Sequence, residues 1–150
     1  MKAQLIMILI ALLAGMVLPI QAGLNVQLGK AVHQPIFAAF ASFLIGTIAL
    51  FFYLLVLKFD FYSMQQGLHS VSPTVWLAGI LGAFYVAVVI ILAPKIGVAM
   101  TFVLIVAGQM SVSLFLDHYG LMGIPIKKIN MLRVLGIFFL IAGVLLIRKF

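Results

Sequence analysis

The chain has no cysteine, no glutamate and few charged residues of any kind. The absence of cysteine excludes disulfides and thiolate metal sites. The two acids are Asp60, between apolar segments, and Asp117, at the end of one, so proton exchange on a mid-membrane carboxylate has no residue to use. The sequence has no metal-ligand spacing, phosphate-binding glycine loop or Ser-x-x-Lys arrangement. We therefore expect neither an enzyme nor a protein with a metal or cofactor.

Apolar residues dominate the composition. They make up 67% of the chain against 7% charged residues, where a soluble domain has about 25% charged residues. The mean hydropathy of +1.39 covers the whole length, which predicts an integral membrane protein with the lipid bilayer as its main partner. The nine Lys and Arg residues are scattered over the segment ends, singly or in pairs, so they form no patch for nucleic acid. A chain of 150 residues predicts a single domain, 1–150.

Five apolar segments are long enough to cross the hydrocarbon, which takes about 20 residues each. The predicted fold is therefore an all-α integral membrane protein with five transmembrane helices. The longest predicted loop is 58–73, and Ala93–Gly97 is predicted to be a tight turn that makes the third and fourth helices antiparallel neighbours. The predicted helices are approximately 4–28, 36–57, 74–93, 97–116 and 131–148.

The first segment could instead be a cleaved signal peptide. Lys2 and the apolar run fit that interpretation, but cleavage after Ala22 would put Ile20 at the position where a small residue is expected. We therefore expect the segment to be a helix of the mature protein.

The charges at the segment ends give almost no preferred orientation. Five Lys and Arg residues fall on the N-terminal side of the membrane and four on the other side. An odd number of helices without charge asymmetry is typical of a dual-topology protein, whose copies insert both ways, although wrong helix boundaries would give the same balance.

Polar residues in the first segment point to a binding site. Pro19 removes one backbone hydrogen bond and is expected to kink or loosen the helix. Gln21 and Asn25 are four residues apart and share a face. An unpaired buried amide costs about 2–7 kcal/mol, so this face should point into protein or a water-filled cavity.

The other segments offer a matching set. Thr101, Gln109, Ser113 and Asp117 recur at multiples of four in the fourth segment, and the third contributes Tyr85. A broken helix with amides that face polar and aromatic groups is typical of a transporter site. The alternative is that such groups only join helices. We apply that second interpretation to Ser42, Thr47 and Ser111, and we place Trp76 in the interfacial aromatic belt.

Two further sets of residues have predicted roles. Asp117 and His118, at a membrane edge, are candidates for coupling or gating. The glycines predicted to form grooves for helix packing are Gly79, Gly82, Gly136 and Gly143.

Two elements carry a family resemblance: Pro-x-Gln-x-x-x-Asn at 19–25, and Ala-Gly-Gln through Leu-Asp-His-x-Gly at 107–120. With the apolar segments in the same order, the chain resembles the YdcZ-type family of the drug/metabolite transporter (DMT) superfamily, small five-helix exporters of the bacterial inner membrane. The resemblance implies a half-transporter that pairs in antiparallel fashion with a second copy or a paralogue. It supplies no substrate.

The sequence thus predicts a secondary transporter, an exporter of a small neutral or zwitterionic metabolite or drug-like compound, working by alternating access as an antiparallel dimer. Pro19, Gln21 and Asn25 would form one wall of the site, and Tyr85, Gln109 and Ser113 would complete it. The alternatives are a structural or assembly membrane protein and a channel-like pore without a translocation cycle.

Overall fold

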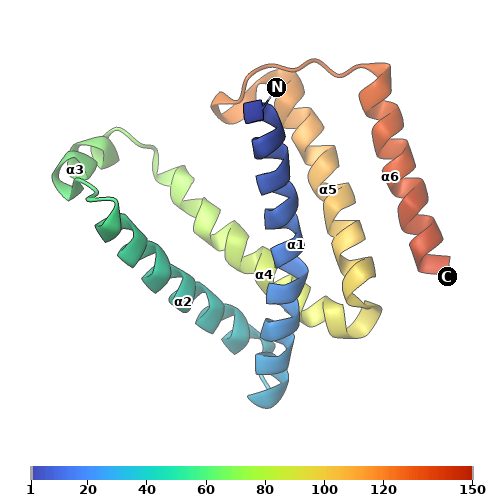
Figure 1. Cartoon of the computed structure of the whole chain (residues 1–150), viewed down its shortest axis with the longest axis horizontal. Coiled ribbons are helices and arrows are strands. Elements are labelled where there is room, and N and C mark those ends of the chain that lie inside the picture. Colours follow the sequence, from blue (N-terminus) through green and yellow to red (C-terminus); the bar gives the residue numbers. More distant parts are fainter. Residues whose placement is uncertain (1, 150) are drawn as a thin grey trace. The chain divides into compact units, whose positions relative to one another are not determined.

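The computed structural model describes residues 2–149, and these residues are almost entirely helical (Figure 1). Contacts between Cα atoms divide the chain into two compact units at the bond between Ile91 and Leu92, and each unit is described by itself. The elements are α1 (Lys2–Ala31), α2 (Pro35–Val56), α3 (Phe61–His69), the short 3₁₀ helix η1 (Pro73–Trp76), α4 (Leu77–Ile96), α5 (Val98–Tyr119), the 3₁₀ turn η2 (Leu121–Gly123) and α6 (Met131–Lys149).

Four helical segments of the described residues are long and apolar enough to cross a membrane. They are Lys2–Ala31, Pro35–Val56, Pro73–Ile96 and Val98–Tyr119. The apolar part of α6, Met131–Ile147, is shorter than these four. The all-helical membrane fold is thus confirmed, with four candidate spans where the sequence predicts five.

The core of the first unit lies where the end of α1 meets the start of α2 and the second half of α4. Ala38, Ala39 and Ile90 are buried there, with Val26 and Val86 packed against them. Small residues allow this close approach.

Gly29 in α1 marks a close contact between α1 and α2. A Cβ atom at this position would lie 3.2 Å from the Cα of Pro35 and 3.6 Å from the Cβ of Ala38. The α1–α2 hairpin is therefore held together at its loop end, and the two helices diverge away from the loop (Figure 1).

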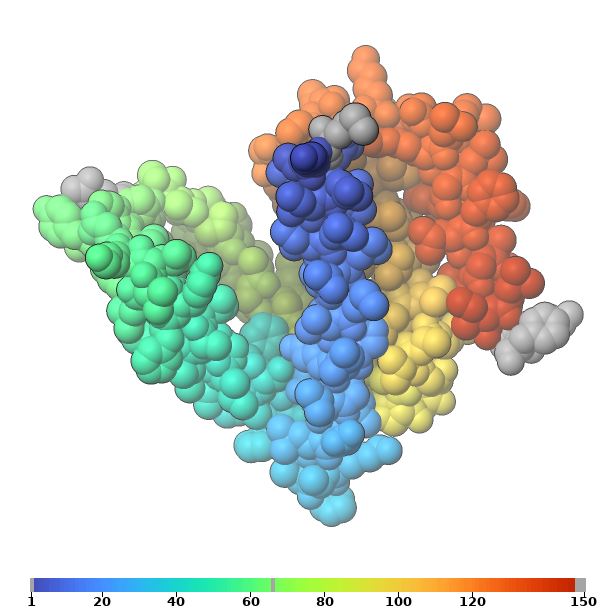
Figure 2. Space-filling view, in the orientation of Figure 1, coloured from blue at the N-terminus to red at the C-terminus, as the bar shows by residue number. Residues whose placement is uncertain are grey.

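The first two thirds of α1 have little protein around them. Every residue from Lys2 to Leu18 is exposed, and the buried residues of the helix are Ala22, Asn25 and Gly29 (Figure 2). Beyond Lys2 and Gln4 at its start, this stretch is apolar on all its faces, as expected of a helix that lipid or other protein surrounds.

The second unit is an antiparallel helix pair. α5 and α6 lie side by side and are joined by the segment 120–130 (Figure 1). Gly120 ends α5 in the left-handed conformation (φ +62°), and its N–H bonds the carbonyl of Leu116. A Cβ atom at Gly120 would lie 2.5 Å from Cγ1 of Ile126, so this turn requires glycine for two reasons.

The predicted loop 58–73 is wrong in part, because it contains α3 and the start of η1. Asp60 caps α3 by accepting hydrogen bonds from the backbone N–H groups of Tyr62 and Ser63. α3 is short and has many polar residues. The spans were identified by their length and hydropathy, so these criteria do not detect α3.

Two prolines interrupt their helices less than predicted. α1 is one helix through Pro19, and α4 continues through Pro94 to Ile96, so the predicted turn at 93–97 reduces to Gly97. Gly97 has φ +87°, a conformation that favours glycine. A proline removes one hydrogen bond, and apolar spanning helices tolerate that loss. The predicted antiparallel packing of α4 on α5 stays a prediction.

Candidate functional site

The two amides predicted to share a face do so, and they meet at one residue of α2. The side-chain nitrogens of Gln21 and Asn25 each donate a hydrogen bond to Oγ of Ser42, and the donor–acceptor distance is 3.3 Å in both bonds. Asn25 is buried, with 8% of its surface exposed, and Gln21 is half-buried. We call Gln21, Asn25 and Ser42 the amide cluster.

The amide cluster has donors and acceptors that are not used by hydrogen bonds within the cluster. Ser42 accepts two bonds through Oγ, and its own O–H remains a donor. The side-chain oxygens of Gln21 and Asn25 receive no hydrogen bond from the described residues. Among the side chains that the structure describes (residues 2–147 without 66), no fully buried nitrogen or oxygen lacks a partner, so these two oxygens keep access to a ligand or to water.

A cavity of about 220 Å³ opens beside the cluster. Thr47 donates its hydroxyl to the carbonyl of Phe43 over 2.8 Å, which leaves the oxygen of Thr47 as an acceptor. The cavity thus combines a short polar edge with apolar walls, as ligand sites usually do. Its lining residues are Gln21, Ser42, Phe43, Gly46, Thr47, Leu50 and Val86.

The depth of the cluster follows from its position along α2. Ser42 comes seven residues after Pro35, which is about 10 Å along the helix axis. The hydrocarbon core is about 30 Å thick, so its midplane lies about 15 Å from each face. With the α1–α2 loop at one face, the cluster lies between that face and the midplane.

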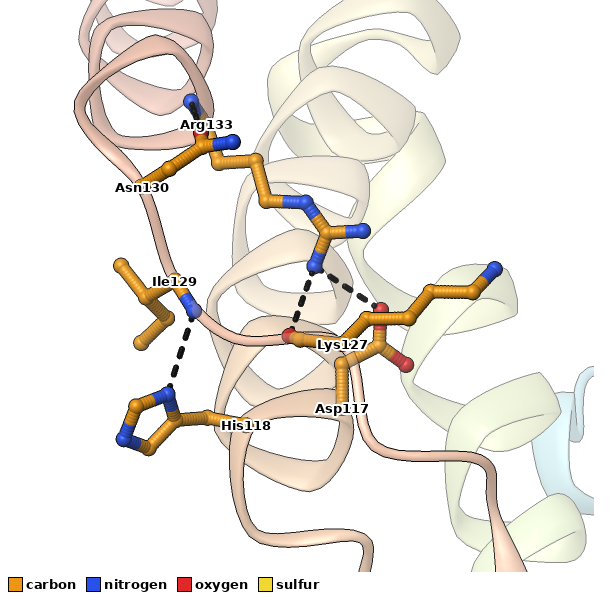
Figure 3. A network of polar contacts seen from close by, with 6 residues as sticks. All are labelled: Asp117, His118, Lys127, Ile129, Asn130 and Arg133. Carbon is orange, nitrogen blue, oxygen red and sulfur yellow. Dashed lines mark hydrogen bonds and ion pairs between the residues drawn. The ribbon is translucent and has the colours of Figure 1, made fainter.

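In the second unit, an ion pair joins α5 to α6. Nη1 of Arg133 lies 3.3 Å from Oδ2 of Asp117, with 31% and 28% of the two side chains exposed (Figure 3). The same nitrogen donates to the carbonyl of Lys127 over 3.1 Å. Nδ1 of His118 accepts a hydrogen bond from the backbone N–H of Ile129 over 3.1 Å. Of the two residues predicted for coupling or gating, Asp117 therefore holds the start of α6 against α5, and His118 holds the segment before α6.

A second cavity, of about 340 Å³, lies beside this ion pair. It has polar groups at one end and apolar side chains over the rest. Its lining residues are Met110, Ser113, Leu114, Asp117, Arg133, Gly136, Ile137 and Leu140.

The remaining predicted site residues are spread over both units. Tyr85 lies in α4, half-buried, but its neighbour Val86 is the one that lines the first cavity. Gln109 is exposed on α5, and Ser113 lines the second cavity. Pro19 is half-buried, two residues before Gln21. The predicted wall of Gln109 and Ser113 opposite the amides stays a prediction.

The hydroxyls interpreted as joining helices differ from one another. Ser42 does join α1 to α2, as predicted. Thr47 bonds within its own helix to the carbonyl of Phe43, and Ser111 does the same to Ala107, so neither joins helices in the described structure. Hydroxyls in helices often satisfy themselves in this way, on the carbonyl four residues before.

The four predicted packing glycines differ in their surroundings. A Cβ atom at Gly82 would lie 3.5 Å from the ring of Phe43, which is ordinary contact. At Gly79, Gly136 and Gly143 it would meet nothing within 4 Å. The last three are open positions within the chain, and their role in packing against another copy stays a prediction.

Sequence reasoning missed two partners. Ser42 was interpreted as a joining residue and left out of the site. Arg133 was counted only among the Lys and Arg residues at the segment ends that bear on orientation. The sequence did contain one indication for Ser42. The residue is a hydroxyl in the first third of the helix that follows the amide pair, so it lies near the same loop as the amides. Arg133 stands 16 residues after Asp117, beyond a turn, so no helical spacing connects the two.

Comparison with curated proteins gives no match, and neither does comparison with solved structures. A family model does match, over residues 6–146, and its description is "Putative inner membrane exporter, YdcZ". The match includes both helical units and every residue of the amide cluster. With its long apolar helices, the chain therefore belongs to the YdcZ family of inner membrane exporters and is an integral protein of that membrane.

Proposed function

We propose that the chain is a secondary exporter of a small neutral or zwitterionic compound, and that the amide cluster binds this compound. The carrying observation is that Gln21 and Asn25 converge on Ser42 at the edge of a cavity. The family supports an exporter rather than an enzyme.

The chemistry of the cavity favours an uncharged substrate. Its polar groups are an amide and two hydroxyls, which offer donors and acceptors but no formal charge. Binding a bare ion in such a site would be unfavourable, because the free-energy cost of burying an unpaired charge is far larger than that of burying an amide. A compact molecule with both donors and acceptors suits the cavity best.

The transport cycle that we propose requires a second chain. We propose that α6 completes a five-span unit, and that two such units pair in antiparallel fashion as a homodimer or with a paralogue. The exposed apolar length of α1 is consistent with such a partner. Gln109 and Ser113 would then complete the binding site, and the contacts of Asp117 and His118 would open and close in alternating access.

A structural or assembly role is the second candidate. The hydrogen bonds of the cluster favour it, since they join α1 to α2 directly. Such bonds between helices are worth about 0.6–2 kcal/mol each in a membrane. The two candidates differ in what removal of one amide does to a protein that still folds.

The test uses Asn25→Leu, with Gln27→Leu as the matched control. Gln27 is an exposed amide on the same helix, two residues away and outside the cluster. A thermal-stability screen of the purified protein against a compound library first identifies a ligand, because a ligand that binds the folded state raises its apparent melting temperature.

We expect Asn25→Leu to purify as a folded protein and to lose about tenfold or more in ligand affinity, the effect of about one good hydrogen bond, while Gln27→Leu binds normally. An Asn25→Leu protein that binds and transports normally would contradict the site. A variant that fails to fold would assign the cluster to structure alone.

A further inference from the structure

We propose that α3 is an interfacial helix whose apolar face, made of Phe61, Met64 and Leu68, lies among phospholipid acyl chains at the membrane surface. The helix follows α2 and precedes η1 and α4, so it connects two candidate spans. We call these three residues the α3 stripe.

The spacing of the α3 stripe gives the helix one apolar side. Met64 and Leu68 follow Phe61 by three and seven residues, which places all three within about 60° around a helix of 3.6 residues per turn. All three side chains stay exposed in part, at 41%, 39% and 42% of their surface, and the exposed part is open to the surroundings of the chain. Ser63 lies on the opposite side.

Contacts to α2 set the depth of the stripe. The ring of Phe61 lies 6.5 Å from that of Phe51 in α2 and 5.3 Å from that of Phe59, measured between ring centres. Phe51 precedes Val56, the end of α2, by five residues, or about 7.5 Å of helix. An interfacial helix buries its apolar face about 5–10 Å into the boundary of headgroups and acyl chains. Figure 2 shows α3, in green, beside the end of α2.

The length of α2 places that end at the interface. Its 22 residues span about 33 Å, close to the roughly 30 Å of the hydrocarbon core. Both ends of α2 must then lie near the membrane surfaces. Lys58 comes two residues after Val56, where its ammonium can reach the headgroups. Because short segments tether α3 on both sides, the stripe stays at this level, and lipid is the occupant that the bilayer supplies there.

The α3 segment itself brings no cluster of positive charge to this docking. Residues 59–72 contain no Lys or Arg, one acid, Asp60, which caps the helix, and one histidine, His69, in the last turn. Attraction to anionic lipid comes from clustered basic residues, which this segment lacks. Insertion should therefore depend on apolar contact alone.

The experiment uses tryptophan as a depth reporter in the full chain. Trp76 is the single tryptophan, so a Trp76→Phe parent is free of background. Met64→Trp and Phe61→Trp report on the stripe. Tyr62→Trp is the matched control, an aromatic exchange at a residue that is 75% exposed and about 100° around the helix from Phe61. Each protein is reconstituted into phosphatidylcholine vesicles, and quenching by brominated phosphatidylcholine is compared with quenching by aqueous iodide.

We expect bromolipid to quench both stripe reporters about twofold more than it quenches Tyr62→Trp, and iodide to show the reverse order. Adding anionic phosphatidylglycerol should leave these ratios unchanged. Iodide quenching that is equal at all three positions would overturn the proposal in favour of a solvated helix. Protection of Met64→Trp from both quenchers would overturn it in favour of a protein partner, and a requirement for anionic lipid would overturn the charge-free mode of binding.

Discussion

At the scale of single residues, Ser42 explains how two buried amides are tolerated in an apolar helix. One hydroxyl oxygen accepts from both Gln21 and Asn25, so each amide satisfies a donor while its oxygen stays available. The four-residue spacing of the amides allowed their shared face to be predicted. Their partner could not be predicted, because a lone serine in an apolar segment has the same local pattern whether it meets an amide, its own helix or lipid.

Asp60 gives a residue-scale prediction on pH. Hydrogen bonds from the Ser63 hydroxyl and from the backbone N–H groups of Ser63 and Tyr62 lower the pKa of the Asp60 carboxyl below its ordinary value of 3.8. The carboxylate form is the one that caps α3. Its contribution to stability is therefore complete above the ordinary pKa and is lost as the pH falls through the lower pKa of the folded protein. We expect Ser63→Ala to raise the pKa of Asp60 towards 3.8.

The measurement is an NMR titration of the aspartate carboxyl carbons. Asp117, the one other acidic residue, is distinguished by its loss in Asp117→Asn. An Asp60 pKa that is the same with and without the Ser63 hydroxyl would show that this hydrogen bond does not form in the membrane-bound protein.

At the scale of elements, the helices were easier to predict than their ends and connections. Long apolar runs located every candidate span, because hydropathy depends on composition over about 20 residues. Pro19 and Pro94 were given too much weight as helix breakers. The rule that proline interrupts a helix considers only the hydrogen bond lost at the proline, and it does not consider that a long apolar helix tolerates this loss. The helix α3 was missed because its nine residues combine one apolar side with polar residues.

The α1–α2 hairpin offers an element-scale prediction at Gly29. A Cβ atom there would lie 3.2 Å from the Cα of Pro35, so the two helices must move apart. We expect Gly29→Ala to lower the free energy of unfolding by about 1–3 kcal/mol, as overpacking does. Gly23→Ala on the same helix is the control. Its Cβ atom would meet nothing within 4 Å, and it should be neutral or stabilising by up to about 1 kcal/mol.

Denaturant unfolding of the two purified variants in detergent measures this difference. Equal stabilities would mean that α1 and α2 do not pack closely at their loop end.

The α5–α6 pair offers a second element-scale prediction. The ion pair of Arg133 and Asp117 is about one-third exposed, so solvent screens it, and we expect a coupling of only about 0.5–1 kcal/mol. A double-mutant cycle with Asp117→Asn, Arg133→Gln and the double variant measures this coupling. Arg133→Gln should cost more than Asp117→Asn, because it also removes the hydrogen bond to the Lys127 carbonyl. Strictly additive effects would mean that the pair contributes nothing to holding α6.

At the scale of the whole molecule, the membrane class and the family followed from composition and two short motifs. The span count and the partner did not follow, because they depend on what surrounds the chain. α6 is at the margin of length for a span, and helices that lie open in one chain can be covered by lipid or by another copy.

The balance of charges gives a prediction for the whole molecule. If α6 crosses the membrane as the fifth span, five Lys and Arg residues lie on one side and four on the other, and copies should insert in both orientations. A C-terminal reporter that is active only in the cytoplasm, and another that is active only outside it, should both give signal. Two added Lys residues beside Lys30 should shift the ratio towards that side being cytoplasmic. A C-terminus on one side only, with no paralogue to pair with, would contradict the antiparallel dimer.

The off-centre depth of the amide cluster has a consequence for such a dimer. Two copies inserted in opposite directions would carry their clusters about 10 Å from opposite membrane faces, and so about 10 Å apart across the midplane. A substrate would meet the same set of hydrogen-bonding groups twice, once near the face where it enters and once near the face where it leaves. The route then looks identical from either side, so the protein itself has no forward direction. Net export would be decided by the gradients on the two sides of the membrane.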